Sequence, residues 1–226
     1  MTLRLADVDR EGALREALDA ATGESRAEFL GRLAVGGGAL LAAFAWAPDA
    51  PAASRRDVAV LNFALTLEYL QAAFYTEAER LGALRDDLRP IPRQLGAVER
   101  AHVQAIRDVL GLEAVGRATF DFRGVTEESD AFLRTAVAFE DLAVAAYKGQ
   151  AGRIRSPALL AAAISIHSVE ARHAAWMRYL VGVQPAARAF DRARSGEDVR
   201  RIVASTRFIV APARTSARRR RPRFTG

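Results

Sequence analysis

The spacing of apolar residues predicts four long α-helices, of which the first is the clearest. Apolar side chains recur at helical spacing after residue 54, as in Val60, Phe63 and Leu67. Ser54 is a typical N-cap residue, and Gly82 is a typical helix-ending residue. We therefore expect a helix that begins after Ser54 and ends at Gly82.

Three further helices follow from the same periodicity together with proline, N-cap and glycine signals. Their expected limits are near Pro92 to Gly111, Thr126 or Ser129 to Gly149 or Gly152, and Pro157, after the N-cap Ser156, to Gly182. Residues 112–125 lack clear periodicity and are long for a turn between helices. They predict a long crossover between the second and third helices. A shorter fifth helix is expected from Glu197 to Val210.

The segment before the first helix has the character of an export signal. Residues 25–30 read SRAEFL and resemble the twin-arginine motif, but Ala27 stands where the second arginine would be. The apolar stretch at 33–47 is shorter than the roughly 20 residues of a membrane-spanning helix. We expect export to a periplasmic or other extracytoplasmic space. A cytoplasmic location follows if the degenerate signal is inactive, and a membrane location only if the segment is an uncleaved anchor. A further alternative is that the segment forms a helix that packs on the bundle.

Composition limits the chemistry without deciding the compartment. Half of the 226 residues are hydrophobic, and the absence of cysteine excludes disulfides, zinc–thiolate sites and thiol nucleophiles. The net charge of +6 is concentrated in a C-terminal tail with the run RRRR at 218–221. No aromatic residue lies between the arginines of this tail, and it contains no reading motif, so we expect a solvated tail or one that binds an anionic surface. Electrostatic binding of nucleic acid is the alternative. Alanine-rich helices permit a homodimer.

These features divide the chain into four parts. We expect a leader at residues 1–53, a four-helix bundle at 54–182, a short helical segment at 183–210 and a disordered basic tail at 211–226.

Six residues at two matching spacings carry the candidate chemistry. The pattern is Glu followed about 30 residues later by Glu-x-x-His, and it occurs twice: Glu68, Glu99 and His102, then Glu140, Glu170 and His173. Two of the three histidines thus have a glutamate three residues before them. Glu68 and Glu140 lie within apolar runs, where a carboxylate is costly unless it has a partner. The alternative is four helices with ordinary solvated Glu and His.

On packed helices these residues can meet at one point and hold two metal ions. Three residues advance a helix by about 300°, so the Glu and His of each Glu-x-x-His project from one face. The symmetric assignment gives each ion one His and one terminal carboxylate, Glu68 or Glu140, while Glu99 and Glu170 bridge both ions. Four carboxylates then balance two divalent cations. Mixed carboxylate and imidazole ligation suits iron or manganese.

Two tyrosines are candidates for a supporting role. Tyr75 and Tyr147 each lie seven residues, or about two turns, after Glu68 and Glu140, and so share a face with them. A buried phenol needs a partner, and a ligating carboxylate on a neighbouring helix would serve. The alternative is a tyrosine at the core edge. His167 lacks a Glu at the required offset, and we expect it to be packed or at the surface.

This set of residues resembles the ferritin-like di-iron carboxylate superfamily, whose members include ferritins, bacterioferritins and rubrerythrins. The export-like leader and the Phe-Asp-Phe sequence at 120–122 are more similar to its secreted bacterial branch, which is related to plant desiccation-associated proteins. The resemblance covers roughly residues 55–182. It implies an all-α, up-down-down-up four-helix bundle with one long crossover and a dinuclear site in its middle.

The resemblance also implies a range of functions. The first expectation is a redox protein with two iron ions, a ferroxidase or a protein that handles O₂ or peroxide and protects against oxidative stress. Tyr75 and Tyr147 would then support the ligands or relay electrons. The alternatives are a dimanganese catalase-like enzyme and a non-catalytic stress protein that its metal stabilises.

Overall fold

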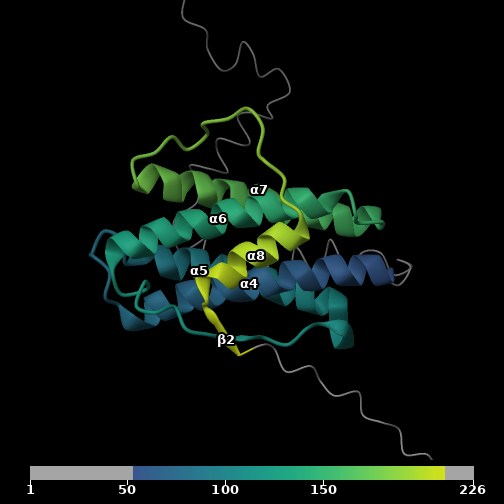
Figure 1. Cartoon of the computed structure of the whole chain (residues 1–226), viewed down its shortest axis with the longest axis horizontal. Coiled ribbons are helices and arrows are strands. Elements are labelled where there is room, and N and C mark those ends of the chain that lie inside the picture. Colours follow the sequence, from purple (N-terminus) through teal and green to yellow (C-terminus); the bar gives the residue numbers. More distant parts are fainter. Residues whose placement is uncertain (1–52, 212–226) are drawn as a thin grey trace, which may run out of the picture.

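The computed structural model describes residues 53–211 (Figure 1). The predictions of an export signal and of a possible uncleaved anchor concern residues 1–52 and lie outside the described part. The prediction of a disordered basic tail also lies outside it, except at Ala211.

Four long helices form the bundle: α4 (Arg55–Leu81), α5 (Pro90–Leu110), α6 (Ser129–Ala151) and α7 (Pro157–Leu180). α4 packs along α5, and α6 packs along α7, so the bundle consists of two antiparallel hairpins. The chain between α5 and α6 runs back along the bundle, so these two helices point the same way (Figure 1). This is the all-α, up-down-down-up bundle with one long crossover that the sequence predicts.

Local signals account for the helix ends. The Ser54 hydroxyl accepts the Asp57 N–H at the start of α4, and Gly82 ends that helix with a φ of 62°. α5 begins at Pro90, two residues before the expected Pro92, because both prolines fit a first turn in which N–H groups have no helical partner. Of the two possible starts for α6, Ser129 is the observed one.

The crossover is fixed to the core by aromatic packing. Its residue Phe122 is 1% exposed and meets Phe74 of α4 edge to face, with ring centroids 5.5 Å apart. Phe74 also stacks on Phe132 of α6, at 5.1 Å. The crossover further holds a short helical turn, η1 (Gly111–Glu113), and a two-residue strand, β1 (Thr119–Phe120), which the sequence analysis did not predict.

The C-terminal part corrects one boundary. The fifth helix, α8 (Gly196–Thr206), ends before the expected Val210, because Arg207 adopts a left-handed φ of 56°. The chain then forms the strand β2 (Ile209–Ala211), which pairs antiparallel with β1. Residues 209–211 are therefore strand, not the end of a helix and the start of a disordered tail. α8 lies across the bundle (Figure 1).

Within the described range, α4 alone is long and apolar enough to cross a membrane. However, 72% of its most apolar window is buried inside the bundle, as a core helix requires.

The residue at position 149 inside α6 is a glycine because the chain before α8 approaches it closely and leaves no room for a side chain. A Cβ on Gly149 would lie 1.8 Å from the carbonyl oxygen of Arg194, whose own N–H donates to the Ala145 carbonyl. Gly149→Ala is expected to lower the free energy of unfolding by about 1–3 kcal/mol, measured by urea denaturation, because the backbone near Arg194 must move.

Gly152→Ala is the matched control. Gly152 has a φ of −67°, and an added Cβ would meet nothing within 4 Å. We expect this variant to match the parent or to gain up to about 1 kcal/mol. Equal stability of the two variants would contradict the close approach.

Candidate metal centre

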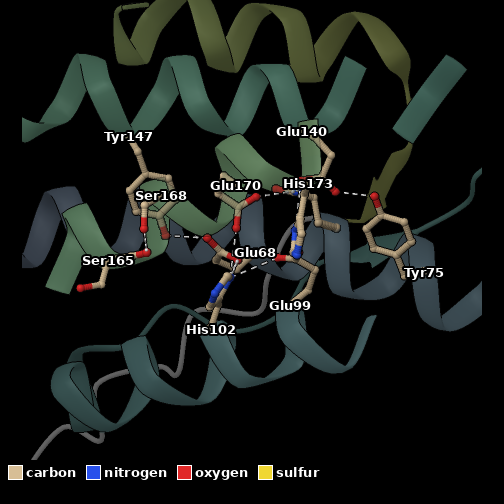
Figure 2. Close-up of polar contacts among 11 residues, drawn as sticks. Glu68, Tyr75, Glu99, His102, Glu140, Tyr147, Ser165, Ser168, Glu170 and His173 are labelled. Carbon is tan, nitrogen blue, oxygen red and sulfur yellow. Dashed lines mark hydrogen bonds and ion pairs between the residues drawn. The ribbon is translucent and has the colours of Figure 1, made fainter. Parts of the chain in front are cut away.

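Four helices bring the six predicted residues to one place in the core (Figure 2). Glu68 comes from α4, Glu99 and His102 from α5, Glu140 from α6, and Glu170 and His173 from α7. All four glutamates are 0% exposed, His102 is 2% exposed and His173 is 8% exposed. The alternative of ordinary solvated side chains is therefore inconsistent with the structure.

The six side chains form two overlapping groups of four. The first group is Glu68, Glu99, His102 and Glu170; the second is Glu99, Glu140, Glu170 and His173. Within each group, one ligand atom from every residue lies within 4.8 Å of the others. Glu99 and Glu170 belong to both groups, which is the arrangement expected for bridging carboxylates.

Both histidines face the carboxylates with Nδ1. In the first group, His102 Nδ1 lies 3.1 Å from Glu170 Oε1 and 3.3 Å from Glu68 Oε2. In the second group, His173 Nδ1 lies 3.1 Å from Glu99 Oε1 and 3.6 Å from Glu140 Oε2. These pairs show which histidine accompanies which terminal glutamate, a detail that the spacing alone left open.

Several of these buried atoms make no hydrogen bond of acceptable geometry, although three of the oxygens lie 3.1–3.3 Å from a histidine Nδ1, as expected for atoms that face a metal ion. They are Glu68 Oε2, Glu99 Oε1, Glu170 Oε1 and His173 Nδ1. A buried polar atom without a partner is costly, and four of them at one point are rare in a folded protein. Coordination of cations would satisfy all four atoms, so the residues fit a metal-binding site.

The family of the chain is shown by a comparison with known domains. Residues 56–183, more than half of the chain, match the model of the ferritin-like domain. The chain belongs to the ferritin-like family. The match includes all six candidate ligands and the four long helices except the first residue of α4. No curated protein matches the chain.

Electrostatics in this ferritin-like core favour a cluster that shares protons when no metal is bound. Burial raises the pKa of Glu68 to about 7, although His102 opposes the shift, and burial also raises the pKa of Glu170. Burial opposes the ionisation of Glu99 too, but His102 and His173 outweigh it and hold its pKa well below the usual range. Burial disfavours the charged form of His173, but Glu140 and Glu99 outweigh it and raise its pKa to about 10.

The two tyrosines connect the hairpins through the terminal carboxylates. The Tyr147 hydroxyl, on α6, donates to Glu68 Oε1 of α4 at 2.5 Å. The Tyr75 hydroxyl, on α4, donates to Glu140 Oε1 of α6. Burial and the nearby carboxylates raise the pKa of both phenols well above the usual value, so both remain donors. Each phenol thus meets a carboxylate on a neighbouring helix, not solvent at the core edge.

One polar residue at the centre was missed by sequence reasoning. Gln71 is 2% exposed, and its Nε2 lies 3.2 Å from Glu140 Oε2 and 3.3 Å from Glu170 Oε2. The available signal was its place three residues after Glu68, which puts an amide on the ligand face of an apolar helix. His167 is half-buried and belongs to neither group of four, in keeping with the expectation that it is no ligand.

Metal affinity should rise with pH, because metal ions must displace protons from this cluster. With the pKa of Glu68 near 7 and that of His173 near 10, both groups hold protons at pH 6 in the metal-free protein. Between pH 6 and pH 8, the Mn²⁺ association constant should increase about tenfold per pH unit for each proton displaced. Calorimetry in buffers of different ionisation enthalpy counts these protons, and an affinity independent of pH would contradict the shared-proton cluster.

Tyr147→Phe tests the phenol–carboxylate contact. At pH 8 the metal-free variant should lose about 1–3 kcal/mol of unfolding free energy, because the buried Glu68 Oε1 loses its donor. Tyr179, which is 70% exposed on α7, provides the control Tyr179→Phe, for which little change is expected. Equal losses in the two variants, measured by urea denaturation, would show that the contact does not stabilise the fold.

Proposed function

We propose that this ferritin-like protein binds two iron ions at the six-residue centre and uses them in redox chemistry with O₂ or peroxide. The observation that carries the proposal is the pair of overlapping ligand groups, each with one histidine, one terminal glutamate and both shared glutamates. Ferritin-like di-iron and di-manganese carboxylate centres are built from this set of residues on this kind of bundle.

Charge balance supports two divalent ions over one. Four ionised carboxylates carry a charge of −4, which two divalent cations cancel, so that the complete centre can remain in an apolar core. Carboxylate and imidazole ligands suit iron and manganese. Bound iron would supply electron exchange with O₂ or peroxide, which none of the side chains at the centre provides by itself.

The protein side chains would hold the metal ions and orient the ligating groups. Glu99 and Glu170 would bridge, Glu68 and Glu140 would each bind one ion, and the two histidines would complete the set through Nδ1. Tyr147 and Tyr75 would hold the terminal carboxylates in place and keep a proton beside each of them. A role of these phenols in electron relay belongs to the same proposal.

The setting of this activity is also a proposal. The SRAEFL sequence and the Phe-Asp-Phe sequence of the crossover support membership of the secreted ferritin-like branch and export by a twin-arginine-like signal. We also propose that the chain is divided into a leader, the bundle, a C-terminal helical segment and a basic tail. Protection against oxidative stress would suit such an exported protein.

Iron loading tests the proposal directly. The purified protein is loaded with Fe²⁺ without air, its metal content is counted, and the near-ultraviolet absorbance of oxidised iron is followed after O₂ is admitted. We expect two irons per chain in the parent, about one in His173→Ala, and none or one in Glu99→Ala, which removes a shared ligand. Glu127→Ala, at an exposed position of the crossover, should behave as the parent.

The outcomes separate the alternatives. Two irons without a response to O₂ or peroxide would contradict the iron redox proposal. Peroxide consumption by the manganese-loaded protein alone would indicate the dimanganese catalase-like enzyme. Metal that only raises the thermal unfolding temperature would indicate a structural role.

A further inference from the structure

Gln71 breaks the symmetry of the polar groups around the metal centre. It lies three residues after Glu68, whereas the residue three after Glu140 is Ala143. Both positions are buried, with 2% and 1% of the residue exposed. The tyrosines occur in both halves of the bundle, but the carboxamide occurs in one.

The contacts of Gln71 are directed at one of the two ligand groups. Its Nε2 lies 3.2 Å from Glu140 Oε2, and Glu140 belongs to the second group alone. It also lies 3.3 Å from Glu170 Oε2, whereas Glu170 Oε1 faces His102 of the first group at 3.1 Å. The amide therefore approaches Glu140, which belongs to the group of His173 alone, and the Glu170 oxygen that does not face His102.

The two terminal carboxylates are consequently held to different extents. Glu140 accepts from Tyr75 at Oε1 and from Gln71 at Oε2. Glu68 accepts from Tyr147 at Oε1, while its Oε2 lies 3.3 Å from His102 Nδ1 but accepts no hydrogen bond from that ring or from an amide. A carboxylate fixed at both oxygens keeps its orientation before any ion arrives, whereas one fixed at a single oxygen can rotate.

We propose that Gln71 is a positioning residue that makes the two metal positions unequal. It fixes Glu140 and Glu170 for the ion held with His173, and it has little influence on the ion held with His102. This inference rests on the proposed dinuclear centre. Loss of an outer hydrogen-bond donor to a ligand typically lowers metal affinity by about 10- to 100-fold, and here we expect that loss at the second position alone.

Gln71→Met in the full chain tests the inference, because it preserves length and burial but removes the donor. Mn²⁺ is titrated by calorimetry, and electron paramagnetic resonance distinguishes a coupled pair of ions from single ones. The parent should bind its two ions with different affinities, whereas in the variant the ion held with His173 should bind about 10- to 100-fold more weakly than in the parent. Gln71→Asn, which withdraws the amide by one methylene group, carries the same expectation and serves if the methionine variant does not fold.

Gln150→Met is the matched control. Gln150 is another buried glutamine, 5% exposed on α6, but the partner of its Oε1 is Arg153 and not one of the candidate ligands. This variant undergoes the same chemical change away from the ligands. Its two Mn²⁺ constants should equal those of the parent.

Single-position backgrounds assign the effect to one ion. His102→Ala leaves the second position, and there Gln71→Met should weaken Mn²⁺ binding by about 10- to 100-fold. His173→Ala leaves the first position, and there Gln71→Met should change binding by less than about twofold.

The possible results are distinct. Unchanged constants in Gln71→Met, or equal weakening in both backgrounds, would overturn the inference while leaving the dinuclear centre intact. A parent that binds fewer than two Mn²⁺ ions would overturn the centre and the inference together.

Discussion

The burial of four glutamates at one point is the constraint on which the rest of this structure depends. Each is 0% exposed, and ionised carboxylates without partners are among the most expensive groups to place in a protein core. In the bundle, two histidines, two phenols and one amide face the carboxylate oxygens. Metal ions would satisfy the oxygens that these donors leave without a partner. Because the groups come from four helices, they meet only when the four helices are in register.

Aromatic packing near one end of the bundle helps to hold that register. Phe74 of α4, one residue before Tyr75, contacts rings from the crossover and from α6. Phe122 of the crossover in turn meets Phe208, which follows α8, with centroids 5.4 Å apart. Segments far apart in the sequence therefore converge beside the Tyr75–Glu140 contact, and their packing fixes the level at which α4 and α6 face each other.

Much of the fold and the site could be predicted, because both depend on local and periodic signals. Glu-x-x-His is a local pattern on one helix face, and the N-cap Ser54 and the glycine Gly82 mark helix ends by their own chemistry. The unpredicted features depend on contacts between distant segments. The last helix ends at the left-handed Arg207, after which β2 pairs with β1. The close approach of Arg194 explains why the residue at position 149 of α6 is a glycine. The role of Gln71 could not be predicted, because it depends on contacts with carboxylates from other helices, which the sequence around a single glutamine does not indicate.

The overlap of the two ligand groups has a consequence for how the centre is divided between the hairpins. The α4–α5 hairpin supplies three residues of the first group, and the α6–α7 hairpin supplies three of the second. The fourth residue of each group comes from the other hairpin: Glu170 in the first group and Glu99 in the second. Neither hairpin contains a complete group, yet each contributes the same three side chains, Glu, Glu and His, in the same order. Two copies of one hairpin, related by a two-fold axis between the two shared glutamates, would offer the same set of side chains. In this respect the single chain has the symmetry of a dimer whose two subunits have been joined by the crossover.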